Sequence, residues 1–410
     1  MSTDTGHLPR LESRESYVDH LEGFTTTDIG QHEPGKPKRT RIKTYMLETA
    51  RYDHSLPAFD RLFPDDAHLH RLDDTLYRVE DAANGRRIVG LIENLDDRHP
   101  VLYTTLPVNE SEKWVRRVVD HNPWLDRLWL SSPILFELWR YVQRTTPIHR
   151  YVRLGFEHTA RYETPSDLLG VDQDPYDDAD TSDEDERAPL DWIERRRSRV
   201  SLTERLALLN TKLMPLMELY DPLHSLVQLQ IPAGERGGHR LYYDGRATNW
   251  SDSFLEHRTI VDLVVRLYRK VTTHAEDRLW VDTTQVGEDG LSFSGAPVTI
   301  RFSEQLSEPT FQRFVDLALR RRTSRFRIGG YIKERGPTKV HLTGIDRHLW
   351  QPFLLEATSH HLLVVLPRGT CGNTIHRLVT NVQRYVDPKV DVWLGSERYS
   401  HAVANSMTTT

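Results

Sequence analysis

A glycine-containing segment near the C-terminus combines residue types suited to binding an anion. It runs Leu-Pro-Arg-Gly-Thr-Cys-Gly-Asn-Thr over residues 366–374, between an expected strand and an expected helix. Two glycines let the backbone turn tightly, and N–H groups at a helix start favour a phosphate or carboxylate. The segment lacks the Gly-Lys-Ser/Thr ending of a Walker loop, so an ordinary turn before a capped helix is the alternative. The candidate binding residues are Arg368, Gly369, Thr370, Cys371, Gly372, Asn373 and His376.

Cys371, the single cysteine of the chain, suggests a second kind of chemistry. A thiol at a helix start can have a lowered pKa, and a histidine such as His376, His360 or His361 can make it a nucleophile. A lone cysteine excludes an internal disulfide and a multi-thiolate zinc site. A small buried residue that fills a tight turn is the other interpretation. An enzyme based on Cys371 is therefore kept as an alternative function.

His68 and His70 alternate around a leucine, so both imidazoles would lie on one face of a strand and could hold a divalent metal. The three residues resemble the His-hydrophobe-His motif of rolling-circle replication nucleases, which pair it with a downstream tyrosine. The acidic flanks, from Asp65 to Asp74, differ from that family's central strand. The resemblance implies a metal-dependent nuclease or hydrolase as a further alternative. The sequence itself assigns no metal site and no cofactor.

Arginines form a second candidate surface for anions. Arg320, Arg321 and Arg322 end an expected helix, and the strand that follows alternates arginine and phenylalanine over residues 325–327. Another arginine-rich run occupies residues 195–199. On one surface, these side chains would track the phosphates of a nucleic acid. Cations at a helix end also suit the helix dipole, so a solvated face is the alternative.

The charge distribution also favours an anionic ligand. The chain carries 54 Lys and Arg against 60 Asp and Glu, a net charge of −6. The run from Asp172 to Glu186 contains nine of the acids and no base, so the remaining residues are slightly basic. Arginine binds phosphate and carboxylate with two parallel hydrogen bonds, which lysine cannot do.

The elements that must position these residues form two sheet-and-helix units in an α+β, mixed α/β fold. The expected sections are a disordered, basic-ended tail (1–43), an N-terminal mixed α/β domain (44–163), an acidic disordered linker (164–189), a helical segment with a hairpin (190–290), a C-terminal domain (291–397) and a tail (398–410).

The C-terminal domain has the clearest pattern. Its expected order is β-α-β-β-(ββ)-α-β, which is ferredoxin-like when the hairpin at 353–366 is treated as an addition. In the middle segment, residues 191–200 are expected to be helical. The sequence Ser201-Leu-Thr-Glu204 predicts a capping box that opens another helix.

Together these features predict a binding or regulatory protein that contacts nucleic acid or a phosphorylated ligand through its arginines and the glycine turn. An enzyme and a scaffold that binds a protein partner remain alternatives. No apolar stretch is long enough to span a bilayer, and the N-terminus lacks a hydrophobic signal core. We therefore expect a cytoplasmic protein without a membrane partner.

Overall fold

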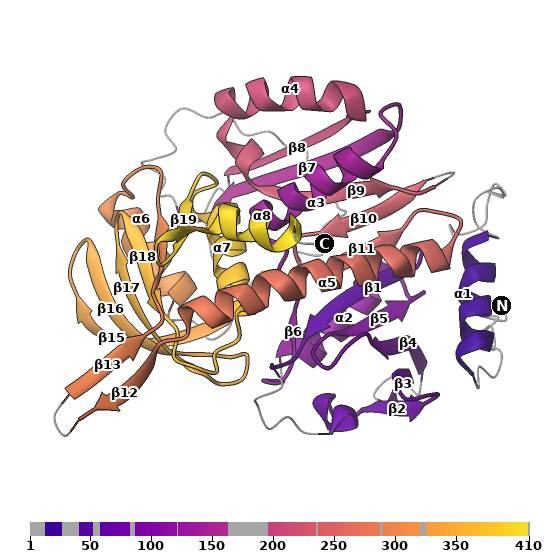
Figure 1. Cartoon of the computed structure of the whole chain (residues 1–410), viewed down its shortest axis with the longest axis horizontal. Coiled ribbons are helices and arrows are strands. Elements are labelled where there is room, and N and C mark those ends of the chain that lie inside the picture. Colours follow the sequence, from indigo (N-terminus) through magenta and orange to yellow (C-terminus); the bar gives the residue numbers. More distant parts are fainter. Residues whose placement is uncertain are drawn as a thin grey trace.

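The structure, a computed structural model, describes residues 13–26, 41–51, 58–82, 87–120, 122–162, 196–234, 237–287, 290–319 and 325–408. Within them, two large sheets whose named strands all pair antiparallel are joined and covered by helices (Figure 1). The expected α+β class is thus confirmed. Among the described helices, none combines the length and apolar character that crossing a bilayer requires. The acidic run 172–186 and the arginines 320–322 lie outside the described residues.

The larger sheet has eleven strands in the order β2-β3-β4-β5-β1-β11-β10-β9-β7-β8, with β6 beside β1. Because β1 pairs with both β5 and β11, strands from the expected middle segment complete the sheet of the first unit. The strands are β1 (Lys43–Glu48), β2 (Ala67–Arg71), β3 (Leu76–Asp81), β4 (Arg87–Asn94), β5 (Pro100–Thr104), β6 (Asp126–Arg127), β7 (Tyr151–Ala160), β8 (Arg196–Arg205), β9 (Leu226–Pro232), β10 (Gly238–Tyr242) and β11 (Arg246–Asn249).

The second sheet has seven strands in the order β15-β16-β17-β18-β14-β19-β20, and β12 with β13 forms a separate hairpin. The expected strand and helix order is present, but β18 lies directly beside β14. The hairpin at 353–366 is therefore integral to the sheet, while β15 and β16 extend its edge. The strands are β12 (Asp282–Val286), β13 (Gly290–Ser294), β14 (Val298–Arg301), β15 (Ile328–Arg335), β16 (Lys339–Asp346), β17 (Pro352–Thr358), β18 (His361–Val365), β19 (Asp391–Leu394) and β20 (Glu397–Arg398).

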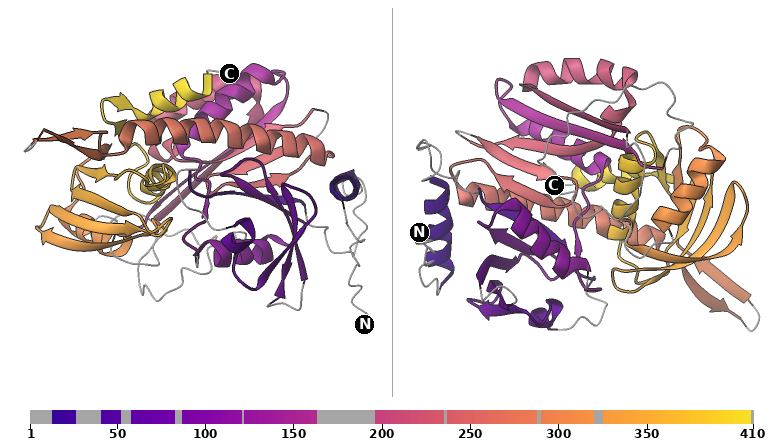
Figure 2. Two further views of the ribbon diagram at one scale, coloured as in Figure 1. Left: turned by 60° about the horizontal axis from the view of Figure 1, so that its bottom comes forward. Right: turned by 180° about the vertical axis from the view of Figure 1, so that it is seen from behind.

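The longest described helix, α5, runs beside both sheets (Figures 1 and 2). It begins after Ser253, whose Oγ accepts a hydrogen bond from the Glu256 N–H over 3.1 Å, as the capping pattern predicts. The helices are α1 (Arg14–Thr26), α2 (Val108–Asp120), α3 (Ser132–Thr145), α4 (Leu206–Leu219), α5 (Phe254–Leu279), α6 (Glu308–Phe314) with a π-helical turn (Val315–Leu319), α7 (Asn373–Tyr385) and α8 (Tyr399–Thr408), besides the 3₁₀ turns η1 (Phe59–Leu62) and η5 (Asp221–His224).

Helix α7 lies at the centre of the molecule, and all of its residues are buried. The main hydrophobic core continues through both sheets, from Tyr17 in α1 to Met407 in α8. The prediction of terminal tails is therefore wrong for residues 14–26 and 399–408, which form α1 and α8. In each, apolar side chains at helical spacing, such as Tyr17 with Leu21 and Tyr399 with Val403, are buried in the shared core.

Residues 196–205 correct another expectation, because they form the strand β8 and not a helix. This strand pairs with β7 along ten residues, from Tyr151 opposite Arg205 to Ala160 opposite Arg196. Helix α4 begins only at Leu206, without a side-chain cap at Arg205. The long pairing with β7 supplies backbone hydrogen bonds that outweigh a local capping pattern.

Candidate functional site

The glycine-containing segment is buried from Thr370 to Thr374, and its helix start already holds an anion from the same chain. The Gly372 N–H donates to Glu276 Oε1 over 2.8 Å. Arg98 binds the same carboxylate through Nη1 at 3.0 Å and Nη2 at 2.6 Å. The Asn373 side chain donates to the Arg127 carbonyl over 2.9 Å. The chemistry expected of this turn is present, but the carboxylate of Glu276 in α5 supplies the negative charge.

Cys371 has properties that favour the neutral thiol. Its side chain is only 3% exposed, and Arg98 Nη2 donates to Sγ over 3.2 Å. Burial raises the pKa of the thiol well above its usual value, the carboxylates Glu48 and Glu276 raise it further, and Arg98 only partly opposes them. A thiolate nucleophile is disfavoured in such surroundings.

His376, the histidine nearest to Cys371 in sequence, forms its hydrogen bonds with other residues. His376 Nε2 lies 3.1 Å from the Thr272 hydroxyl, and Nδ1 lies 2.6 Å from the Tyr399 hydroxyl. Burial, assisted by Arg98, lowers the pKa of His376 to about 3. The neutral imidazole therefore links α5, α7 and α8 as a hydrogen-bonding group of the core.

The described residues at the start of this segment do not converge on the α7 start. Arg368 is exposed beside Asp282, with Nη1 3.4 Å from Oδ2, and the Thr370 hydroxyl donates to the Pro367 carbonyl over 2.8 Å. Gly369 adopts a positive φ of 93°, which suits glycine. Arg320, Arg321 and Arg322 lie outside the described residues.

The metal-site hypothesis also finds little support. His68 and His70 are exposed on β2, and His70 Nε2 lies 3.3 Å from Glu80 Oε2. Within the described ranges, no group of three or more His, Cys, Asp or Glu side chains is arranged to hold a metal ion.

A different group of arginines shares one face of the larger sheet. Arg153 in β7 is opposite Gln230 in β9, and Gln230 is opposite Arg240 in β10. Directly opposed residues share a face, and so do residues two apart in a strand. We call this surface the basic face; its side chains are those of Arg197, Arg199, Ser201, Thr203 and Arg205 in β8, Tyr151, Arg153, Glu157 and Thr159 in β7, Gln228 and Gln230 in β9, Arg240 and Tyr242 in β10, and Arg246 and Thr248 in β11.

The opposite face of the same strands is apolar and covered. Leu154, Leu229 and Leu241 are fully buried, and α3 and α5 pack against β9 and β11. In Figure 1 these helices lie in front of the strands, and the right panel of Figure 2 shows the strands from behind. In β8 the odd-numbered residues 197–205 are exposed and the even-numbered residues 198–204 are half-buried. The sheet therefore leaves the basic face open along β8.

Positive charge on the basic face is incompletely neutralised. Burial lowers the pKa of Arg153, and the neighbouring charges of Arg240 and Arg199 lower it further. Arg153 Nε donates to the Ser201 hydroxyl over 2.8 Å. The one carboxylate in this stretch of β7, Glu157, is buried beneath α7 and paired with Arg197 at 3.0 Å and with Arg384. Among the described residues, no carboxylate forms an ion pair with Arg153, Arg199 or Arg240.

Aromatic rings accompany these guanidinium groups. The Arg240 guanidinium lies 4.3 Å from the Trp250 ring centre, and that of Arg246 lies 4.1 Å from the Tyr242 ring centre. Buried donors on the same face, Nε of both arginines and Gln228 Nε2, have no acceptor among the described residues. The face thus combines unneutralised cations, aromatic rings and unused hydrogen-bond donors.

Sequence reasoning identified the arginine run at 195–199 but not the surface to which Arg197 and Arg199 belong. The period of two in Arg197, Arg199, Ser201, Thr203 and Arg205 is a signal that was available. Arg153 and Arg240 lie far from this run in sequence, so only the strand order reveals the cluster.

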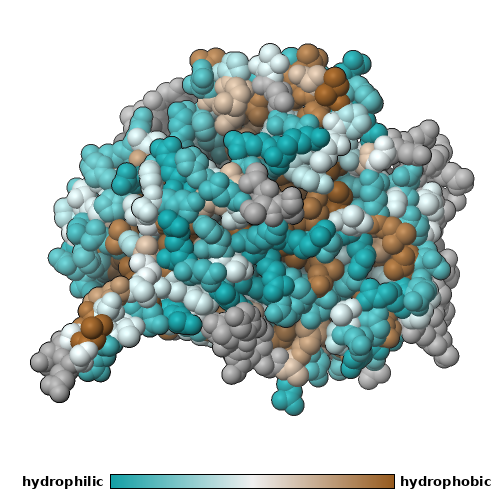
Figure 3. All heavy atoms as spheres, viewed as in Figure 1, coloured by the Kyte–Doolittle hydropathy of each residue, from teal (hydrophilic) through white to brown (hydrophobic). Residues whose placement is uncertain are grey.

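The scaffold alternative would use a separate apolar surface on α4. Leu208, Met214 and Leu219 are exposed there, the last by 83%. Figure 3 shows hydrophobic atoms at the top of the molecule, where Figure 1 places α4.

Comparisons with known proteins extend over nearly the whole chain. Residues 10–400 match the family described as MJECL33-like protein. The relative named Uncharacterized protein MJECL33, from Methanocaldococcus jannaschii, is 24% identical over 428 residues, and the match covers 97% of each chain. No solved structure matches the chain.

Proposed function

The chain belongs to the MJECL33-like protein family, and we propose that it is a cytoplasmic protein that binds single-stranded nucleic acid on the basic face. The observation that carries the proposal is the cluster of Arg153, Arg199 and Arg240, which no described carboxylate neutralises. Positive charges that are held close together repel one another. A polyanion relieves that repulsion and releases counterions when it binds.

The accompanying rings support a single strand over a duplex. Trp250 and Tyr242 lie beside arginines on the same side of the sheet. Unstacked bases pack on such aromatic and guanidinium planes, whereas bases within a duplex are already stacked. An open sheet face can present several such planes in a row, so it suits a flexible strand.

A direct test is fluorescence anisotropy with a labelled oligothymidine of about 20 nucleotides, longer than a typical single binding site. We expect the logarithm of the binding constant to fall linearly with the logarithm of salt concentration. In the combined variant Arg153→Gln, Arg199→Gln, Arg240→Gln, the slope should become shallower by about 2, because each lost phosphate contact on a single strand contributes about 0.7.

The matched control is Arg266→Gln, which removes an exposed arginine from α5 that is paired with Asp262. It should bind the oligonucleotide as the unmodified protein does. Salt-independent binding, or equal slopes for the triple variant and the control, would contradict a role for the basic face. Tighter binding of a duplex of the same length would contradict the single-strand preference. Pyrophosphate binding that is lost in the triple variant, without oligonucleotide binding, would instead assign the face to a small phosphorylated ligand.

A further inference from the structure

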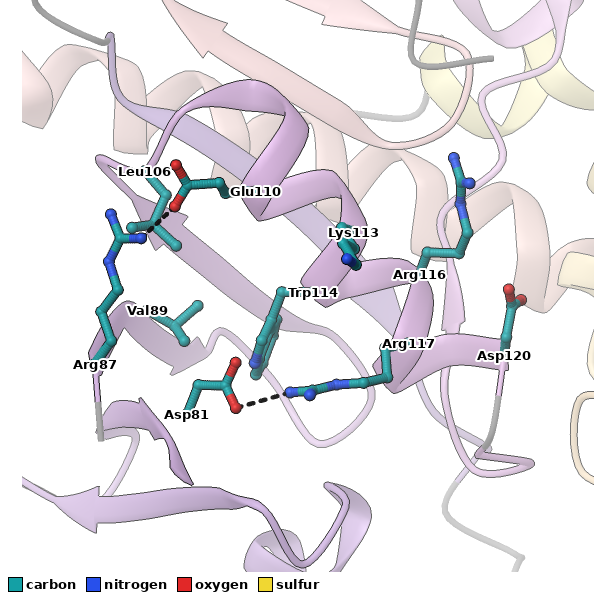
Figure 4. A pocket seen from close by; sticks show the side chains of 10 residues that line it. All are labelled: Asp81, Arg87, Val89, Leu106, Glu110, Lys113, Trp114, Arg116, Arg117 and Asp120. Atoms are coloured by element: carbon teal, nitrogen blue, oxygen red, sulfur yellow. Dashed lines mark hydrogen bonds and ion pairs between the residues drawn. The ribbon is translucent and has the colours of Figure 1, made fainter. Parts of the chain in front are cut away.

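A pocket of about 550 Å³ lies between α2 and the strands β3 and β4 (Figure 4). Its volume is in the range of small-molecule sites. Val89, Leu106 and Trp114 provide its apolar surfaces, and charged side chains surround them. None of its lining residues belongs to the basic face, so a ligand here would be bound independently of the proposed nucleic acid.

Trp114 supplies a hydrogen-bond donor that the fold does not use. Its side chain is 4% exposed, and the buried Nε1–H has no acceptor among the described residues. Such groups are rare because a buried donor without a partner is costly. In Figure 4 the Trp114 ring lies between the pair Arg87–Glu110 and the pair Arg117–Asp81. A ligand with an acceptor beside a flat apolar surface would satisfy both the donor and the ring.

The charges around the pocket differ in how fully they are paired. Arg117 is held by Asp81 at 3.0 Å and by Asp66 at 3.1 Å, and Arg87 pairs with Glu110. Lys113 is exposed at the pocket, and no described carboxylate pairs with it. Lys113 is therefore the lining cation that a ligand can reach without breaking one of these ion pairs.

We propose that this pocket binds a planar aromatic molecule, about the size of a mononucleotide, that carries an anionic group. The ring packs against Trp114, Val89 and Leu106, an acceptor on it takes the Trp114 Nε1–H, and the anionic group reaches Lys113. Aromatic stacking and one charge-assisted hydrogen bond are both available in this arrangement.

Isothermal titration calorimetry of the full chain with adenosine monophosphate tests the proposal. Adenosine lacks the anionic group and ribose 5-phosphate lacks the ring, so each should bind at least about tenfold more weakly. Lys113→Gln should weaken the binding of adenosine monophosphate by about tenfold and leave the binding of adenosine unchanged. Trp114→Phe keeps an aromatic ring but removes the Nε1–H donor, so it should weaken the binding of both adenosine monophosphate and adenosine.

Lys333→Gln, which changes an exposed lysine in β15, is the matched control and should bind as the unmodified protein does. The proposal is overturned if adenosine monophosphate produces no binding heat, or if Lys113→Gln and Lys333→Gln bind it equally well. Because Lys113 is at the surface, this comparison stands even if Trp114→Phe fails to fold. Loss of monophosphate binding in the basic-face triple variant would also overturn it, since that result would place the ligand on the other surface.

Discussion

Two arginines and two aspartates form a closed network where the two sheets meet. Asp126 in β6 accepts hydrogen bonds from Arg327 over 3.0 Å and from Arg377 in α7. Arg377 also binds Asp346 in β16 over 2.5 Å. All four side chains are almost completely buried. Because their formal charges cancel, the network is stable only when every member is present.

We expect Asp126→Asn to lower the free energy of unfolding by about 3–5 kcal/mol, since it leaves two buried guanidinium groups short of one negative charge. Asp262→Asn breaks an exposed pair in α5 and should cost less than about 1 kcal/mol. Urea unfolding of both variants measures the difference. Equal losses would mean that the buried network contributes no more than a surface pair.

The stability difference between the unmodified protein and Asp126→Asn should depend on pH. Burial raises the pKa of Asp126, but Arg327 and Arg377 more than offset it, so the pKa lies below its ordinary value. A depressed pKa stabilises the fold above the unfolded value of about 4 and loses that contribution as pH falls through the folded pKa. The stability gap between the unmodified protein and Asp126→Asn should therefore narrow below about pH 4. A gap that stays constant down to pH 2 would show that charge is not its source.

Residue types predicted the kind of interaction that a group makes more reliably than they predicted its partner. The sequence predicted that the α7 start attracts an anion, and Gly372 does bind one, but the carboxylate belongs to Glu276. Arg327 was considered a phosphate contact, whereas it is buried against Asp126, 201 positions away. Which charges neutralise one another depends on chain packing, and a single sequence carries no record of those distances.

At the scale of elements, regular local patterns predicted the structure well where tertiary pairing agreed with them. Helix α7 begins at Asn373, at the end of the glycine-containing segment where a helix is expected, and Ser253 caps α5. Residues 196–205 show the opposite case. Their capping pattern covers four residues, whereas the pairing of β8 with β7 covers ten. The larger number of backbone hydrogen bonds decides the outcome.

The start of α7 provides a test of packing between elements. A Cβ at Gly372 would lie 2.9 Å from Thr272 Cγ2 and from the Thr272 carbonyl oxygen in α5, although its φ of −62° suits any residue. Gly372→Ala should therefore lower the free energy of unfolding by about 1–3 kcal/mol through overpacking. Gly23 in α1 has nothing within 4 Å of such a Cβ, so Gly23→Ala should raise it by about 0.5–1 kcal/mol.

Thermal and urea unfolding of these two alanine variants distinguish steric crowding from helix propensity. Both substitutions make the same chemical change, and only the surroundings differ. If Gly372→Ala is as stable as the unmodified protein, Gly372 is not in close contact with Thr272 of α5.

At the scale of the whole molecule, the chain folds as one sheet system across the segment that the sequence marked as a boundary. Strands before residue 163 and strands after residue 195 are interleaved in the larger sheet, because β7 lies between β8 and β9 and β1 lies between β5 and β11. Separation of the two parts would expose the edges of β7 and β1 along their full pairing. Exposed edges of this length are strongly disfavoured.

Co-expression of residues 1–177 and 178–410 as two chains tests this continuity. We expect the fragments to associate through the pairs β7–β8, β7–β9 and β1–β11, and to elute together at the size of a one-to-one complex. Their complex should unfold in a single transition in urea, because one hydrophobic core includes side chains from both fragments. Each fragment expressed alone leaves one side of those pairs open and should be insoluble or unfolded. Two soluble fragments that elute separately, each with its own cooperative transition, would instead establish independent domains. The boundary at residue 177 is chosen so that no described strand is cut, which leaves pairing between the fragments as the quantity under test.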